Sequence, residues 1–412
     1  MRLVPADGSL DVDADLTALE VRFDRDMDRS RHAFCGGGPA FPAISRVEWV
    51  DARTLRANVD LRPDAVYLVE LSCAGSSGFR DAKGNRLEPV LWRFCTKDES
   101  PAPPEVALAR NQKAFARLGE AVHDYYSYRD RLGVDWSERF EAHRESMLGA
   151  PSKAALALIA ADILSAAQDP HVSVVYGRTA VPTTRRRVIP NCNPALLPSL
   201  LAGYEALGKK TFRARTEDGI GYVRIDSFRA EDRAEIDAVL DALRGMRDAK
   251  GIVIDVRLNS GGDETLARSI AALFVEGRRV YAAHTTRNPR SPGGFDERRD
   301  REIEGAADRF EGPVAVLTGP VVMSSAEAFL LMMKQASKAR LVGAPSYGSS
   351  GNPIPHSIAG GLVVMLPSWR ALRPDGTCFE GTGILPDIPV EAADFSSRDR
   401  VLESALSYLR GL

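Results

Sequence analysis

The chain has 412 residues, of which 44% are hydrophobic and 27% charged, so it can bury more than one core without disulfide staples. Its 54 Lys and Arg residues against 56 Asp and Glu residues leave a formal net charge of -2, which excludes the basic footprint of a nucleic-acid-binding protein. Gly and Pro interrupt the long uncharged stretches, which excludes a membrane-spanning helix.

The first hundred residues alternate short runs of β-forming residues with turn residues. Runs at 19–23, 47–50, 54–59 and 67–71 have the period of two that is typical of half-buried strands. Several short strands of this kind predict a β-sandwich over residues 1–97. The Pro-Ala-Asp-Gly that opens this region and the Trp-Arg-Phe-Cys-Thr that closes it resemble bacterial Ig-like domains, and the resemblance implies a module that binds a partner, carries a neighbour or spaces a domain.

The cysteines and the N-terminus bear on the cellular compartment. The five cysteines are odd in number and lack Cys-x-x-Cys spacing, which indicates neither a zinc ribbon nor a redox pair, while a bridge between Cys73 and Cys95 is left open. The N-terminus has no apolar stretch of signal-peptide length. We expect a cytoplasmic protein if the chain is complete, and an exported or periplasmic protein if a signal was trimmed.

A linker and a helical segment come next along the chain. Residues 98–105 combine charges with three prolines, which predicts an extended linker. Helical spacing then predicts three helices within a segment that covers residues 106–178. Pro170 ends the last helix, so His171 is expected to begin an extended segment.

Residues 179–412 predict an α/β core. Apolar strand-like runs alternate with amphipathic helical patterns, which favours a largely parallel sheet with helices on its faces. The expected strands lie at 221–225, 251–256, 314–317 and 340–343, and the expected helices at 230–246, 264–274 and 324–336. Residues 291–305 open on turn residues and become charge-dense, which predicts a mobile surface loop.

Two loops at the carboxyl ends of the expected strands are candidates for a site, because sites in α/β sheets form there. One loop carries the pair Gly261-Gly262 directly before a helix, and the other places Ser324 at the start of a helix. Backbone amides at a helix N-terminus can stabilise an oxyanion. Ser324-x-x-Glu327 is also a capping box, and on that spacing alone a structural cap is the favoured interpretation.

Five ordered motifs change that balance. They are residues 221–228, 255–262, 324–327, 341–348 and 383–390. Together they resemble the tricorn-core and carboxyl-terminal-processing family of serine peptidases, over about 106–390. The resemblance implies a β/α spiral akin to the crotonase and caseinolytic-protease fold, with Ser324 as the nucleophile. It also implies an oxyanion hole made by the amides of Ser325 and of either Gly261 or Gly262.

The general base distinguishes two branches of that family. One branch uses a lysine just after the position of Gly348, where this sequence has Ser349, and no lysine follows Lys338. A serine hydroxyl is a weak nucleophile without an adjacent base, so a replacement is required. The sequence therefore disfavours a Ser/Lys mechanism.

The tricorn-like branch supplies the replacement. Its base histidine follows a helical segment in a motif like residues 169–173, which implies His171, although a lone histidine after a proline is more often structural. A glutamate shortly before the Gly-x-x-Pro-Asp-Ile motif implies Glu380 as the group that orients the imidazole. That branch has a serine directly before the histidine, where this chain has Pro170.

These inferences predict a tricorn-like serine endopeptidase that acts on peptides or unfolded proteins, without a metal or organic cofactor, and a homo-oligomer is left open. The alternative is a non-catalytic ligand- or protein-binding protein on the same fold. A third interpretation makes the Ig-like module the functional part and the core its scaffold. About 40 residues between the histidine segment and the core are too few for an additional PDZ module.

Overall fold

The structure is a computed structural model, and it describes all residues except 73–77, 185–187, 392–394, 396 and 412. The chain divides into two compact units, each made of two segments. Unit 1 comprises Met1–Arg186 and Pro353–Pro367, and unit 2 comprises Arg187–Asn352 and Ser368–Leu412. Within the described ranges, no helix combines the length and the apolar character that a bilayer crossing requires.

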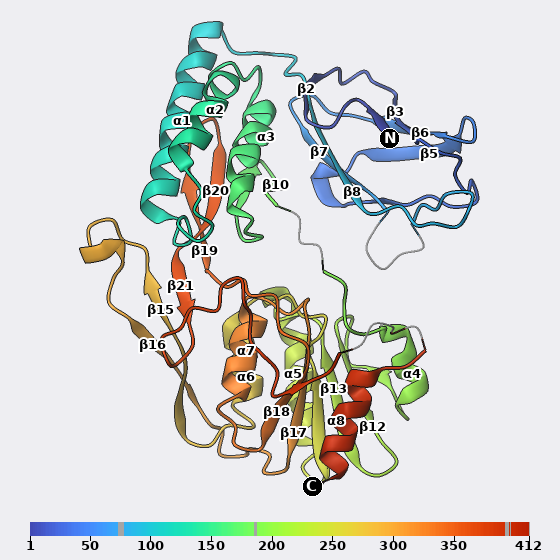
Figure 1. Cartoon of the computed structure of the whole chain (residues 1–412), viewed down its shortest axis with the longest axis vertical. Coiled ribbons are helices and arrows are strands. Elements are labelled where there is room, and N and C mark those ends of the chain that lie inside the picture. Colours follow the sequence, from blue (N-terminus) through green and yellow to red (C-terminus); the bar gives the residue numbers. More distant parts are fainter. Residues whose placement is uncertain (73–77, 185–187, 392–394, 396, 412) are drawn as a thin grey trace. The chain divides into compact units, whose positions relative to one another are not determined.

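Unit 1 begins with two four-stranded sheets, which we call the N-terminal module (residues 2–96; blue in Figure 1). Alternate side chains from both sheets enter one hydrophobic core, which includes Leu19, Leu55 and Trp92, so the predicted period of two is confirmed. The Ig-like identity of the module stays a prediction. The first sheet has β1 (Arg2–Val4), β3 (Ala18–Arg22), β6 (Thr54–Asp60) and β5 (Ala43–Trp49), and the second has β2 (Ser9–Val12), β8 (Val90–Thr96), β7 (Val66–Leu71) and β4 (Phe34–Cys35), with η1 (Gly38–Ala40) between β4 and β5.

Three helices follow, as the helical spacing predicts: α1 (Pro104–Tyr125), α2 (Trp136–Leu148) and α3 (Lys153–Leu164), the last continued by η2 (Ser165–Ala167). Ser152 caps α3, because its hydroxyl accepts a hydrogen bond from the amide of Ala155 at 3.0 Å. Every residue of α3 except Lys153 and Asp162 is buried. A helix that is apolar on all sides lies inside a core, and α3 packs against strands of the N-terminal module as well as against α2 and β9.

A third sheet completes unit 1, with the strand order β10-β9-β20-β19. Its members are β9 (Ser173–Tyr176), β10 (Thr179–Pro182), β19 (Pro353–Ser357) and β20 (Leu362–Pro367). β9 directly follows the His171 segment and pairs antiparallel with β20, so a hairpin from far along the chain supports it.

Unit 2 is built on a seven-stranded sheet with the order β11-β12-β13-β14-β17-β18-β22, parallel from β13 onward. Helices α5, α6 and α7 share one core with the sheet, and α4 and α8 share another, so helices cover both faces as the α/β alternation predicts (Figure 1). The strands are β11 (Glu205–Ala206), β12 (Thr211–Arg215), β13 (Ile220–Ile225), β14 (Gly251–Asp255), β17 (Val314–Thr318), β18 (Ala339–Gly343) and β22 (Ile388–Pro389). The helices are η3 (Pro194–Leu196), α4 (Leu197–Leu200), η4 (Ala230–Asp232), α5 (Arg233–Arg244), α6 (Glu264–Ala271), α7 (Ser325–Met333) and α8 (Arg400–Arg410).

A smaller antiparallel sheet of unit 2 corrects one prediction. It consists of β16 (Arg299–Glu304), β15 (Arg278–Thr286) and β21 (Trp369–Leu372), with η5 (Pro292–Gly294) between β15 and β16. The second half of the expected mobile loop 291–305 is therefore a paired strand. The density of charge concealed the alternation, because Arg301 is buried on the same face as Ile303.

The cysteines correct a second expectation. Cys95 is a free, buried thiol whose Sγ lies 3.2 Å from the carbonyl oxygen of Leu10, and burial raises its pKa to about 12. The suggested bridge from Cys73 to Cys95 is therefore wrong, although Cys73 itself lies outside the described residues. Cys35 is disulfide-bonded.

Candidate functional site

Two neighbouring strands of the large sheet bring the predicted loops together in unit 2. β14 pairs parallel with β17, so the loops that follow them leave the same edge of the sheet. A Cβ atom added to Gly261 would lie 2.8 Å from Cβ of Ser324 and 2.9 Å from the amide nitrogen of Ser325. The Ser325 hydroxyl also donates a hydrogen bond to the carbonyl oxygen of Gly262 at 2.6 Å. The glycine pair therefore lies directly against the N-terminus of α7.

Ser324 occupies a strained backbone conformation. Its φ of 57° and ψ of -129° place a non-glycine residue in a region that L-amino acids rarely adopt. Its amide lies 2.8 Å from the carbonyl oxygen of Ser349 and 3.2 Å from a carboxylate oxygen of Glu327, and these contacts hold the turn. The capping contact expected from Glu327 is thus present, on a serine whose strained turn from strand to helix is typical of a nucleophile.

Glu327 organises the loop that faces Ser324. Its fully buried carboxylate accepts hydrogen bonds from the Ser346 hydroxyl at 2.6 Å, the Gly348 amide at 2.7 Å and the Ser349 amide at 3.0 Å. Desolvation raises the pKa of Glu327 to about 7, against the lowering effect of these donors. The Ser324-x-x-Glu327 spacing predicts only a helix cap at Glu327, and not its contacts with the facing loop.

The backbone amides of the two loops differ in what they bind. The amide of Gly261 donates to the side-chain oxygen of Asn259 at 2.8 Å. Within the part of the chain that the structure describes, the amides of Gly262 and Ser325 have no protein acceptor. One donor at the start of α7 and one in the loop beside it are thereby left for an anionic group.

Glu380 reaches the same region through the segment 349–350. Its carboxylate accepts a hydrogen bond from the amide of Ser350 at 2.9 Å, and the preceding residue, Ser349, accepts the amide of Ser324. Unit 2 therefore brings together five of the six predicted site residues: Ser324, Ser325, Gly261, Gly262 and Glu380.

His171 belongs to unit 1, and its pairing with Ser324 and Glu380 stays a prediction. Its backbone amide donates to Oδ1 of Asp169 at 2.9 Å, and its Nδ1 lies 3.7 Å from the same oxygen. Asp169 is fully buried and also accepts the hydroxyl of Tyr126 at 3.0 Å. Asp169 is not among the predicted site residues, although aspartates often form turns by accepting the backbone amide two residues on.

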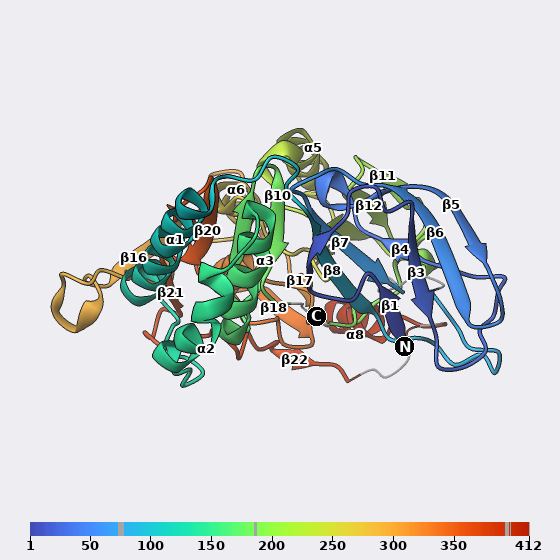
Figure 2. The same ribbon diagram turned by 90° about the horizontal axis from the view of Figure 1, so that it is seen from above.

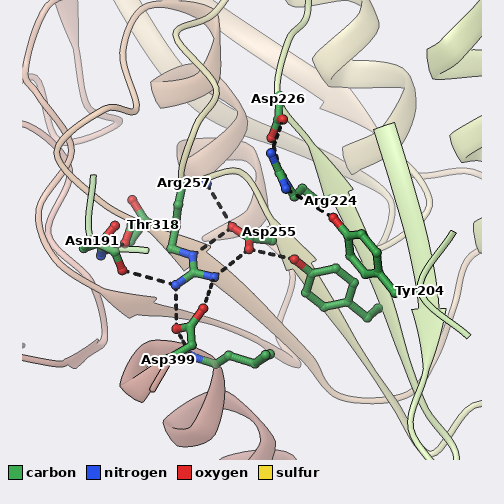
Figure 3. Close-up of polar contacts among 10 residues, drawn as sticks. Asn191, Tyr204, Arg224, Asp226, Asp255, Arg257, Thr318 and Asp399 are labelled. Atoms are coloured by element: carbon green, nitrogen blue, oxygen red, sulfur yellow. Dashed lines mark hydrogen bonds and ion pairs between the residues drawn. The ribbon is translucent and has the colours of Figure 1, made fainter. Parts of the chain in front are cut away.

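A buried ion network includes Arg257 of the loop 256–263, which carries Gly261 and Gly262 and which we call the glycine loop. Figure 3 shows Arg257 between Asp255 and Asp399. Its guanidinium nitrogens lie 2.7 Å from an oxygen of each carboxylate. The side chain of Arg257 is 0% exposed. Arg257 holds the pKa of Asp255 below its usual range even though burial acts in the opposite direction.

Asp399 ties this network to the C-terminal helix. Its carboxylate accepts the amide of Leu402, so the residue that caps α8 also binds the arginine of the glycine loop. Asp399 is not among the predicted site residues, because it lies beyond the last motif, residues 383–390.

The described residues contain no group of three His, Cys, Asp or Glu side chains that could hold a metal ion.

Comparison with known proteins shows what this chain is similar to. The sequence profile of "Peptidase family S41" matches residues 219–390. A protein of Staphylococcus aureus (strain COL) named "Probable CtpA-like serine protease" is 24% identical over 195 residues, which are 47% of this chain and 38% of that protein. The "Carboxy-terminal-processing protease" of Bartonella bacilliformis is 26% identical over 185 residues, 44% of this chain and 41% of the relative. The match thus spans about two fifths of the length of these curated relatives.

Solved structures share the fold. A candidate peptidase from Parabacteroides merdae has a TM-score of 0.63 and 21% identity, and covers 73% of this chain and 96% of its own. Mature CPAF has a TM-score of 0.54 and 11% identity, and covers 74% of this chain and 96% of its own. The family resemblance predicted from the five motifs is confirmed by these comparisons. Residues 219–390 are thus similar to peptidase family S41, and this chain is similar to carboxy-terminal-processing proteases over part of their length.

Proposed function

We propose that this protein is a serine endopeptidase that hydrolyses peptides or unfolded proteins through an acyl-enzyme on Ser324. The observation that carries the proposal is the strained backbone of Ser324, which places the serine against Gly261 at the start of α7. Strain of this kind persists where the surrounding structure fixes it, and it is common at active sites.

The reaction would begin when Oγ of Ser324 attacks the carbonyl carbon of the peptide bond and His171 takes the hydroxyl proton. We assign the oxyanion to the amides of Ser325 and Gly262, since the amide of Gly261 is bound to Asn259. His171 then gives its proton to the leaving amine, and water releases the acyl group.

We propose His171 rather than a lysine as the base. No lysine follows Lys338, and Ser349, which stands at the lysine position of the other branch, uses its amide to bind Glu327. Glu380 is the proposed orienting group, because its carboxylate is fixed by Ser350 beside the Ser324 turn.

A fluorophosphonate probe tests the nucleophile and the base. We expect the probe to label Ser324 in the wild type and Ser324→Ala to abolish labelling, while Ser407→Ala, at an exposed position of α8, retains it. His171→Ala should slow labelling by roughly 10²–10⁴-fold, the usual share of a general base, whereas the exposed His123→Ala should not. Undiminished labelling in His171→Ala would contradict the base, and tight ligand binding without labelling would support a carrier.

Gly261→Ala tests the contact between the two loops. The new Cβ would meet Ser324 at 2.8 Å on a backbone with φ of 101°, so we expect labelling to fall by at least roughly tenfold. Gly277→Ala is the matched control, because Gly277 also has a positive φ but nothing within 4 Å of the added atom. Equal labelling rates in the two variants would contradict the proposed site.

A further inference from the structure

Asp64 of the N-terminal module contacts the elements on both sides of the His171 segment. Oδ2 of Asp64 accepts the hydroxyl of Tyr176 at 2.5 Å, and Oδ1 accepts the amide of Ala154 at 3.0 Å. Tyr176 ends β9, the strand that begins two residues after His171. Ala154 lies in the first turn of α3, the helix that leads to His171. One carboxylate from a distant part of the sequence thus bridges the helix before His171 and the strand after it.

The module holds this carboxylate in a fixed turn. Asp64 has a φ of 44° between β6 and β7, and its amide donates to the carbonyl oxygen of Lys97 at 2.8 Å. The next amide, of Ala65, donates to the hydroxyl of Thr96 at 3.0 Å, and that hydroxyl donates to the carbonyl oxygen of Arg62 at 2.6 Å. Because Thr96 is fully buried, the turn is locked onto the end of β8.

The charge of Asp64 suits both of its partners. A carboxylate at the N-terminus of α3 interacts favourably with the helix dipole and satisfies an amide that has no partner within the helix. Burial, and then the hydrogen bond to Asp64, raise the pKa of the Tyr176 hydroxyl, so it stays a donor at neutral pH.

Packing joins the same elements. Val66 and Cys95 of the module belong to one hydrophobic core with the buried face of α3 and with Val172 and Val174, which flank the His171 segment. Figure 2 shows α3 beside β7 and β8, and both strands contact the helix. Removal of the module would expose part of the apolar surface of α3. A freely tethered domain, by contrast, covers no such surface of its neighbour.

We infer that the N-terminal module is a positioning element of the active site, in which Asp64 holds the His171 segment by tying Tyr176 to the start of α3. The inference rests on the proposed role of His171 and goes beyond it, since it gives the module a part in the reaction of its own chain. Asp64 is a positioning residue, because it acts through Tyr176 and α3.

Hydrogen–deuterium exchange of the full-length protein tests the mechanical part of this inference. We expect Asp64→Ala to speed amide exchange in residues 169–176 by roughly tenfold, the effect of losing about one hydrogen bond to a charged group. Tyr176→Phe, which keeps the bond to Ala154, should have a smaller effect and protects the test if Asp64→Ala folds poorly. Asp26→Ala is the matched control, since Asp26 is an exposed carboxylate of the same module that pairs with Arg53.

Fluorophosphonate labelling tests the catalytic part. Asp64→Ala should slow the labelling of Ser324 by roughly tenfold and move the pH midpoint of the labelling rate, after each rate is divided by the folded fraction measured at the same pH. A loss of rate caused only by unfolding would disappear on that correction. Asp64→Asn, which keeps one oxygen acceptor, should fall between Asp64→Ala and the wild type.

The outcomes separate this inference from the proposed function. Faster exchange in residues 169–176 with unchanged labelling would overturn the catalytic role of the module, and unchanged exchange would overturn the inference as a whole. Absence of labelling in the wild type would instead refute the proposed function, while the exchange data would still decide whether Asp64 holds the segment.

Discussion

The two candidate catalytic segments are held by different physical means. In unit 2, the loops around Ser324 rest on a buried ion network, because Arg257 pairs with Asp255 and Asp399. Glu327 adds hydrogen bonds to the facing loop. In unit 1, the His171 segment rests on single hydrogen bonds, such as those that Asp169 accepts from Tyr126 and from the His171 amide.

The two segments should therefore respond differently to the substitution of a single side chain. Ionic contacts in a dry interior are strong only while both partners are present, so the loss of one partner leaves an uncompensated charge. The loss of a carboxylate that accepts hydrogen bonds from tyrosines and amides costs less, because a neutral substitute such as asparagine can still accept one of them. Single substitutions in the network around Arg257 should therefore cost much stability, and conservative substitutions beside the His171 segment should cost little.

The first prediction concerns Arg257, and it carries the greatest expected loss of stability. Arg257→Met keeps an aliphatic side chain but leaves the carboxylates of Asp255 and Asp399 buried without their partner. We expect the free energy of unfolding to fall by about 3–5 kcal/mol, measured by urea denaturation followed by circular dichroism.

Arg215→Met provides the control for that measurement. Arg215 pairs with Asp248 at the surface, where its side chain is 43% exposed, and such pairs contribute about 0–1 kcal/mol. A loss in Arg257→Met no larger than in this control would show that the buried network is not what stabilises the region.

The second prediction concerns the pH dependence of the stability that Glu327 contributes to unit 2. The pKa of Glu327 in the folded protein is about 7, above its ordinary value of 4.5, so its contribution to stability is full below about pH 4.5 and is lost as the pH rises through about 7. The shift corresponds to about 3 kcal/mol. Glu327→Gln cannot ionise, so its stability deficit against the wild type should narrow between these pH values. Urea denaturation at several pH values measures this, and a constant deficit would contradict the raised pKa.

The sequence motifs predicted unit 2 better than unit 1 for a physical reason. Asp255 ends β14, and Gly261 and Ser324 lie in the strand-to-helix loops, where local spacing and the family resemblance both apply. The free amide of Gly262 and the strained φ of Ser324 depend on how two loops meet, which one sequence does not state.

The support of the His171 segment was harder to predict, because it comes from far along the chain. The pair of Asp64 with Tyr176 joins residues that are 112 positions apart, and β20 reaches β9 from residues 362–367. Short turns and strand periodicity predicted the strands of the N-terminal module but not the face that packs on α3. Likewise, the charges of β16 concealed a strand whose alternate residues are buried.

The last prediction concerns the hydrogen bonds that Asp169 accepts beside the His171 segment, where we expect only a small loss of stability. Asp169→Asn keeps one oxygen acceptor for the amide of His171, and its new amide group can donate to the hydroxyl of Tyr126, so we expect a stability loss of only about 1 kcal/mol. Labelling of Ser324 should slow a fewfold, and Asp162→Asn, on a half-exposed carboxylate beside His143, is the control. If Asp169→Asn instead slowed labelling as much as His171→Ala, the buried carboxylate 3.7 Å from Nδ1 of His171 would replace Glu380 as the orienting group, and the histidine segment would depend on a buried charge as strongly as the nucleophile region does.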